Sequence, residues 1–148
     1  MKRKTIENIL KFLEAKDNKE IPYRWFDSLP KHNLVTKLEN HPDGVQYKHN
    51  GNLELINAPI TKLPNDLYVE GGFELNDCVK LTKLPDKLHV EGNLNLFNCR
   101  NITELPNKLY VEGFFIIVKT KLANKYSDEE IYEMVRLGGG EIKGDILR

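Results

Sequence analysis

Aromatic and acidic side chains recur at matching positions of a repeated segment, and their types and spacing suggest binding chemistry. The aromatic positions, and the acidic positions two residues later, are Tyr68, His89, Tyr110 and Glu70, Glu91, Glu112. Residues two apart on a strand share one face, and neighbouring strands lie about 4.8 Å apart. Stacked strands would therefore carry one aromatic and one acidic ladder. Such a strip could receive Lys and Arg side chains of a partner, with the tyrosine rings as anchors.

Further polar residues extend this surface. Lys48 and Asn50 precede the two ladders, and Glu54, Glu74 and Asn95 continue the acidic and polar positions alongside. The residues that we expect to contact a partner are Tyr68, Glu70, Glu74, His89, Glu91, Asn93, Tyr110 and Glu112. Stacked glutamates repel one another, and a cation from a partner would relieve that repulsion. The alternative is that repeat duplication copied a solvated Val-Glu-Gly turn whose charge keeps the sheet soluble.

The sequence does not favour catalysis. Its histidines, which are His32, His41, His49 and His89, are scattered without the spacing of a zinc site. No phosphate-binding loop is present, and Gly138–Gly140 lacks the strand-to-helix context of one. A hydrolase built on Glu70 and Glu91 would need a cleft that shifts their pKa values, and an open sheet offers none. We therefore expect no enzyme, no metal and no cofactor.

The elements that position these residues come from three near-copies of a 20–21-residue unit. The glycines Gly51, Gly71, Gly92 and Gly113 step by 20, 21 and 21 residues. A fixed period of this length is typical of a solenoid, in which stacking of the units supplies the core. The prolines Pro64, Pro85 and Pro106 are expected to keep the return segments extended.

Each unit is predicted to contain one strand with an inner and an outer face. In the middle unit the predicted inner residues are Leu88, Val90, Gly92, Leu94 and Leu96. Cys78 and Cys99 occupy one slot of successive units. Stacking would bring the two thiols close enough for a disulfide to be considered, but buried thiols that fill a tight corner are the favoured interpretation.

Capping segments are predicted on both sides of the repeats, within a single domain over 1–148. Residues 1–50 would form the first cap, with an amphipathic helix over 5–16 and Tyr23, Trp25, Phe26 and Leu29 packed beneath it. Residues 51–122 would form the repeats. Residues 123–148 would form the second cap, in which a capping box at Ser127 starts a helix to about Leu137, followed by a short strand within 141–147.

One strand is predicted to be apolar on both faces. Phe114, Ile116 and Val118 alternate with the inner residues Phe115 and Ile117. The outer face of such a strand needs a cover. We expect the C-terminal helix to supply it through Ile131, Met134 and Val135, with a partner or a second copy of the chain as the alternatives.

The composition narrows the function classes. The 148-residue chain has 22 Lys plus Arg and 22 Asp plus Glu, so its formal net charge is zero. Direct nucleic-acid binding usually requires a basic excess and is not expected. No apolar run approaches the ~20 residues that span a bilayer, and the N-terminus lacks the apolar segment of a signal peptide. We therefore expect a cytoplasmic location.

The repeats resemble leucine-rich repeats of the short bacterial and bacteriophage type. The matching pattern is L-x-L-x-x-C-x-x-I-T-x-L-P, which runs from Leu94 to Pro106. The resemblance covers about residues 51–122 and implies an α/β repeat fold: a short right-handed solenoid with one parallel sheet whose concave face binds proteins. Similar repeats occur in bacterial ubiquitin ligases, but no cysteine follows Leu122, so that activity is not carried over.

The sequence thus predicts a non-catalytic protein-binding module. It would occupy or scaffold a partner with a basic surface through an acidic and aromatic concave sheet. We expect it to bind neither a small-molecule substrate nor a membrane. Repeats of this short bacterial and bacteriophage type suggest a phage accessory protein that inhibits a host or defence factor in the host cytoplasm. The alternative is a self-associating structural or particle component.

Overall fold

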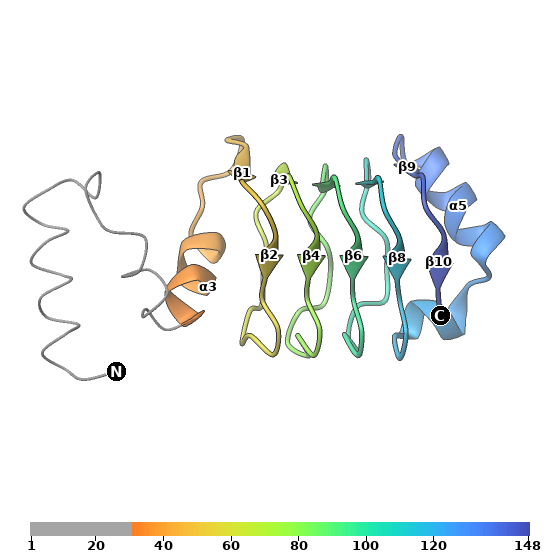
Figure 1. Ribbon diagram of the computed structural model, residues 1–148, viewed down its shortest axis with the longest axis horizontal. Helices are drawn as coiled ribbons and strands as arrows, with labels where there is room; N and C mark the ends of the chain where they lie inside the picture. The colour runs from red at the N-terminus through yellow and green to blue at the C-terminus, as the bar shows by residue number, and fades with distance from the viewer. Residues whose placement is uncertain (1–30) are drawn as a thin grey trace, which may run out of the picture.

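The protein is a β-solenoid with short strands stacked in parallel along its length (Figure 1). The computed structural model describes residues 31–148. The helix predicted over 5–16 and the packing predicted for Tyr23, Trp25, Phe26 and Leu29 lie outside the described residues. Within the described part, a helix at each end flanks the stacked strands.

The strands form two five-stranded parallel sheets. Sheet A consists of β1 (Tyr47–His49), β3 (Leu67–Val69), β5 (His89–Val90), β7 (Tyr110–Val111) and β9 (Glu141–Ile142). Sheet B consists of β2 (Leu53–Glu54), β4 (Phe73–Glu74), β6 (Leu94–Asn95), β8 (Phe115–Ile116) and β10 (Ile146–Leu147). We call one sheet A strand and the sheet B strand after it a rung. The prediction of one parallel sheet is wrong, because each predicted strand bends and is divided between two sheets.

The bend occurs at a column of glycines. Gly71 donates its N–H to the carbonyl of Gly51 at 3.1 Å, and Gly92 to that of Gly71 and Gly113 to that of Gly92, both at 3.0 Å. A Cβ on Gly92 would lie 2.7 Å from the nitrogen of Gly72 and 2.9 Å from the carbonyl carbon of Gly71. Successive rungs therefore approach so closely at this corner that there is no room for a side chain.

The core lies between the two sheets and the return segments, and it confirms the predicted inner positions. In the middle rung Leu88, Val90, Leu94 and Leu96 are fully buried. Their counterparts in the adjacent rungs are also buried, and these are Leu67, Val69, Phe73, Leu75, Leu109, Val111, Phe115 and Ile117. The return segments contribute Ile60, Leu81 and Ile102 to the same core. The exception is the glycine column, which was predicted inside and is partly exposed at the corner.

The two cysteines are buried side by side in the stack and form no disulfide. The thiol of Cys78 donates to the carbonyl of Leu55 at 2.8 Å, and that of Cys99 to the carbonyl of Leu75 at 2.9 Å. Burial raises the pKa of the Cys99 thiol to about 12. The prediction that both thiols are buried and pack tightly within the stack, without a disulfide, is confirmed.

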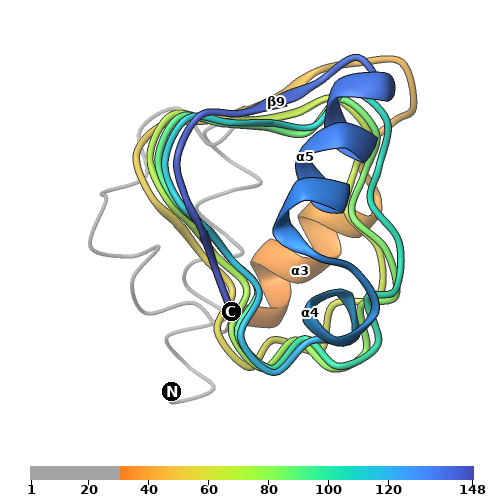
Figure 2. The same ribbon diagram turned by 90° about the vertical axis from the view of Figure 1, so that its right-hand side faces the viewer.

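The C-terminal segment closes one end of the solenoid. Helix α4 (Lys121–Lys125) is followed by α5 (Asp128–Leu137), whose capping box joins Ser127 and Glu130 as predicted. Figure 2, a view along the stack, shows α5 lying across the end of the coil. Ile131 and Val135 of α5 are buried there.

The same segment then adds a fifth rung through β9 and β10, as the short strand predicted within 141–147 suggested. The register pairs Tyr110 with Glu141 and Phe115 with Ile146. The prediction that α5 covers the outer face of the last repeat is wrong, because Phe114 remains 44% exposed. The helix instead covers the end of the core, where an uncapped rung would expose its inner residues.

Helix α3 (Lys31–Glu39) lies at the opposite end and was not predicted. Its Val35 and Leu38 are buried in the common core. One continuous apolar core therefore extends from α3 at one end of the solenoid to α5 at the other.

Candidate functional site

The candidate site is the outer face of sheet A, where each ladder continues along the stack. The strand register places Lys48 beside Tyr68, Tyr68 beside His89, His89 beside Tyr110, and Tyr110 beside Glu141. Backbone hydrogen bonds place Glu70, Glu91, Glu112 and Lys143 on successive rungs two residues later. We call these nine residues the outer strip. Its backbone is fixed by the same parallel ladder that holds the core.

Three rings stack along the centre of the outer strip. The ring centroids of Tyr68 and His89 are 4.5 Å apart with 20° between their planes. Those of His89 and Tyr110 are 5.6 Å apart at 25°. The ammonium of Lys48 lies 5.6 Å from the Tyr68 ring centroid and extends the stack at one end. This stacking limits the freedom of all three rings.

Lysines flank the acidic ladder on both sides. The ammonium of Lys48 lies 3.0 Å from the carboxylate of Glu70, and that of Lys143 lies 3.6 Å from the carboxylate of Glu112. Both pairs are substantially exposed, so each contributes little to stability. Part of the glutamate repulsion expected from the sequence is therefore relieved within the chain itself.

Glu91, the middle glutamate, interacts with a neutral group instead. The hydroxyl of Tyr68 donates a hydrogen bond to its Oε1. This bond, followed by desolvation and then by the charges of Glu91, Glu112 and Glu70, raises the pKa of Tyr68 to about 12. The Tyr68 hydroxyl therefore keeps its proton and remains a hydrogen-bond donor to Glu91.

His89 lies between the two tyrosines with an unsatisfied ring nitrogen. Its Nε2 is buried and has no hydrogen-bond partner among residues 31–148. One imidazole nitrogen of His89 and one carboxylate oxygen from each of Glu91 and Glu112 lie within 4.8 Å of one another. A hollow of about 180 Å³ adjoins this group and is lined by His89, Tyr110, Val111, Glu112, Glu141 and Lys143.

Six of the eight residues predicted to contact a partner come together in the outer strip. Glu74 does not, because the corner places it on sheet B, where its Oε2 accepts from Asn95 Nδ2 at 2.9 Å. Asn93 lies at the corner, and its side-chain oxygen accepts from the backbone N–H of Phe114 at 2.8 Å. Asn93 therefore joins two rungs, as Asn52 does by accepting from Gly72 at 2.7 Å.

Two residues of the outer strip were missed, namely Glu141 and Lys143. The signal was present in Glu141-Ile142-Lys143-Gly144, which occupies the places of Tyr110-Val111-Glu112-Gly113. The two helices of the cap are inserted between these segments. They lengthen the interval beyond the regular period, so a search at 20–21 residues does not find the last unit.

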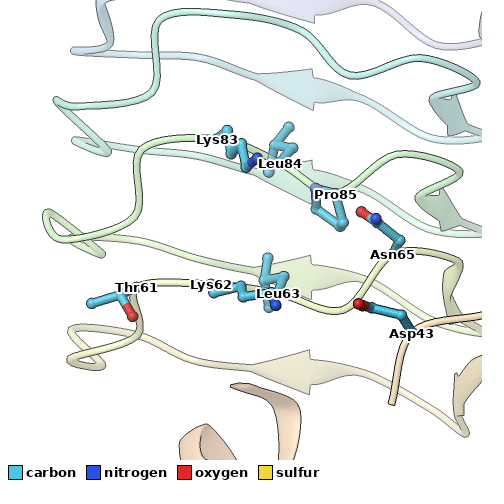
Figure 3. Close-up of a pocket in the computed structure, with 8 residues that line it drawn as sticks. All are labelled: Asp43, Thr61, Lys62, Leu63, Asn65, Lys83, Leu84 and Pro85. Atoms are coloured by element: carbon cyan, nitrogen blue, oxygen red, sulfur yellow. The ribbon is translucent and has the colours of Figure 1, made fainter. Parts of the chain in front are cut away.

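A second hollow of about 410 Å³ lies among the return segments of successive rungs (Figure 3). Its lining includes Lys62 and Lys83 at equivalent positions of two repeats, with Asp43 and Asn65 beside them. The hollow brings together no histidine, cysteine or carboxylate pair from the described residues, and we assign it no chemistry.

The fold and the outer strip define a class of structure, a capped parallel β-solenoid with an aromatic and acidic face. No protein-family model matches the chain, and no curated protein or solved structure matches it either. Among the described residues, no helix is long and apolar enough to cross a bilayer.

Proposed function

We propose that this protein is a non-catalytic binding module that occupies or scaffolds a partner protein through the outer strip. The observation that carries the proposal is the stack of Tyr68, His89 and Tyr110 beside the ladder of Glu70, Glu91 and Glu112. Aromatic rings held rigid at a surface provide contact area at low entropic cost, and carboxylates beside them select a basic partner.

The charge of the outer strip supports a basic partner. Its carboxylates outnumber its ammonium groups, since Glu141 adds a fourth acid while Lys48 and Lys143 are its bases. Tyr110 remains 39% exposed at the centre of this face. An arginine or lysine from a partner would find a carboxylate and an aromatic face within reach of one another.

The repeats also support a more specific proposal. Their resemblance to short leucine-rich repeats of bacteria and bacteriophages suggests a cytoplasmic phage accessory protein. In that role the protein would inhibit a host or defence factor by covering its surface. A nuclease whose basic groove binds nucleic acid is a chemically suitable target, because an acidic strip can occupy such a groove.

Self-association is the second candidate function, and a separate surface favours it. Phe114 and Leu147 on the outer side of sheet B are 44% and 41% exposed, and Ile116 lies half-buried beside Leu147 in the register. An apolar face of this kind would be covered in a dimer or a larger assembly. Sedimentation equilibrium of the purified chain tests this alternative, which requires a mass that rises with concentration.

Charge reversal of the outer strip tests the main proposal. Immobilised wild-type chain and a variant with Glu70, Glu91 and Glu112 changed to Lys are incubated with lysate of the host. A matched control changes Glu54, Glu104 and Glu133 to Lys, which alters the net charge equally on other surfaces. Bound proteins are identified by mass spectrometry and their affinities are measured with purified components.

The three variants separate the outcomes. A partner captured by the wild type and the control, but lost by the strip variant, supports the outer strip as the binding surface. A partner lost by both variants indicates a non-specific charge effect. A partner retained by both rules out the outer strip, and recovery of the chain alone favours self-association.

A further inference from the structure

We propose that His89, Glu91 and Glu112 form a binding site for a divalent transition-metal ion such as Zn²⁺. One nitrogen and two carboxylate oxygens from these residues already lie within 4.8 Å of one another. This inference does not depend on the proposed protein-binding function, because it concerns the chain by itself.

The first argument is the unsatisfied imidazole. A buried polar atom without a partner costs free energy, and the Nε2 of His89 is such an atom. Stacking between Tyr68 and Tyr110 holds the ring in place, at 4.5 and 5.6 Å between centroids. A metal ion bound through a ring nitrogen would give the imidazole a partner and would leave its proton on the other nitrogen.

The second argument is that both carboxylates have an oxygen to spare. Glu91 accepts the Tyr68 hydroxyl on Oε1, and Glu112 faces Lys143 with Oε1. Among residues 31–148, no hydrogen bond or ion pair engages the Oε2 of either residue. Metal coordination through Oε2 would therefore leave both existing contacts in place.

The third argument is the rigidity of the backbone that carries the ligands. His89 and Glu91 lie two residues apart and share an outward face, while Glu112 is on the adjacent rung and donates its N–H to Val90 at 2.9 Å. Zn²⁺ binds imidazole nitrogen and carboxylate oxygen at about 2.0–2.2 Å, which places ligand atoms about 3.4 Å apart. Rotation of the two exposed glutamate side chains can bring their carboxylate oxygens from their present positions to that separation.

The donor set also indicates which ions are suitable. One imidazole with two carboxylates suits Zn²⁺ and similar first-row ions, whereas Mg²⁺ prefers oxygen ligands and retains its waters. The neighbouring hollow of about 180 Å³ leaves room for water to complete the coordination. We therefore expect Zn²⁺ to bind to one site and Mg²⁺ to bind much more weakly.

Titration calorimetry of the untagged full chain with ZnCl₂ tests the proposal. We expect one saturable site that is weakened at least about tenfold by Glu112→Gln and by His89→Ala. Glu70→Gln is the matched control, because it removes the same charge from the same ladder one rung outside the cluster. It should change the affinity by less than about threefold. Circular dichroism establishes that each variant is folded, and Glu112→Gln preserves the shape of the side chain if His89→Ala does not fold.

Cobalt absorption separates this site from the cysteines. Co²⁺ bound by imidazole and carboxylate lacks the thiolate charge-transfer band that binding to Cys78 or Cys99 would produce. A saturable site with no such band, sensitive to Glu112→Gln and insensitive to Glu70→Gln, supports the proposal. Three results would overturn it: no saturable Zn²⁺ binding up to millimolar concentration, equal weakening by both glutamine variants, or a thiolate band.

Discussion

Replacing Gly92 by alanine tests the physical origin of the corner between the two sheets. A Cβ at Gly92 would lie 2.7 Å from the nitrogen of Gly72, and 2.9 and 3.0 Å from the carbonyl carbon and oxygen of Gly71. All three are backbone atoms, so no side-chain rotation can relieve the contacts. Ordinary contacts between heavy atoms begin near 3.4–3.5 Å, so the two rungs would have to separate by about 0.7 Å.

That separation determines the magnitude of the effect. The hydrogen bonds from Gly92 to Gly71 and from Gly113 to Gly92 are 3.0 Å long and would be stretched beyond hydrogen-bonding distance. Overpacking of this kind costs about 1–3 kcal/mol, and the reduced entropy of the unfolded chain offsets about 0.4–1 kcal/mol. We expect a net loss of about 1.3 kcal/mol in the free energy of unfolding, or roughly 3–5 °C in Tm.

Thermal and urea unfolding followed by circular dichroism measures this loss. Gly72→Ala is the control from the same corner, because its Cβ would meet nothing closer than 3.5 Å. We expect this control to leave the stability unchanged or to raise it by up to about 1 kcal/mol. Equal stability of the Gly92→Ala variant and the wild type, or an equal loss in both variants, would refute the steric explanation of the corner.

Three further predictions concern single side chains. The pKa of Cys99 is raised from 9.0 to about 12, so the folded state keeps a proton that the unfolded state releases between these values. The free energy of unfolding should therefore fall as pH rises above 9. In urea titrations at pH 8 to 10.5, Cys99→Ala should flatten that slope. Lys87 has a φ of 60°, which suits asparagine better than lysine, so Lys87→Asn should raise Tm by about 2 °C while Lys83→Asn leaves it unchanged. An unchanged or lower Tm of the Lys87→Asn variant would contradict this explanation. Ser127→Ala removes the hydroxyl that accepts from the backbone N–H of Glu130 at 3.1 Å, and it should lower the free energy of unfolding by about 1 kcal/mol. An unchanged unfolding midpoint would mean that α5 contributes nothing to the cooperative unit.

The inner positions of the repeats could be predicted because the chain repeats itself. When the period is fixed, Leu88 must stack between Leu67 and Leu109, and a set of leucines at one position is either buried together or exposed together. The ladders of the outer strip follow from the same logic. Tyr68, His89 and Tyr110 are adjacent in the register because their repeats are adjacent.

The capping segments were harder to predict because they do not repeat. Sequence patterns located α5 through its capping box, but they assigned Ile131 and Val135 to the outer face of the last strand. Apolar periodicity shows that a helix has a buried side and does not show which surface covers it. The open end of a solenoid exposes the inner residues of a whole rung, and that surface is the one that α5 covers.

The sequence by itself determined the repeat, the parallel stacking, the buried positions and the two ladders, because each depends on spacing alone. The tertiary structure decided where the chain bends, because Gly92 in a strand is compatible with either a bulge or a corner until the neighbouring rung is in place. It also decided the charge balance of the outer strip, since Lys143 reaches Glu112 only after the chain has passed through two helices and returned to the sheet. The regular period brings His89, Glu91 and Glu112 together, whereas the contact of Lys143 with Glu112 joins segments at irregular spacing and depends on how the whole chain packs.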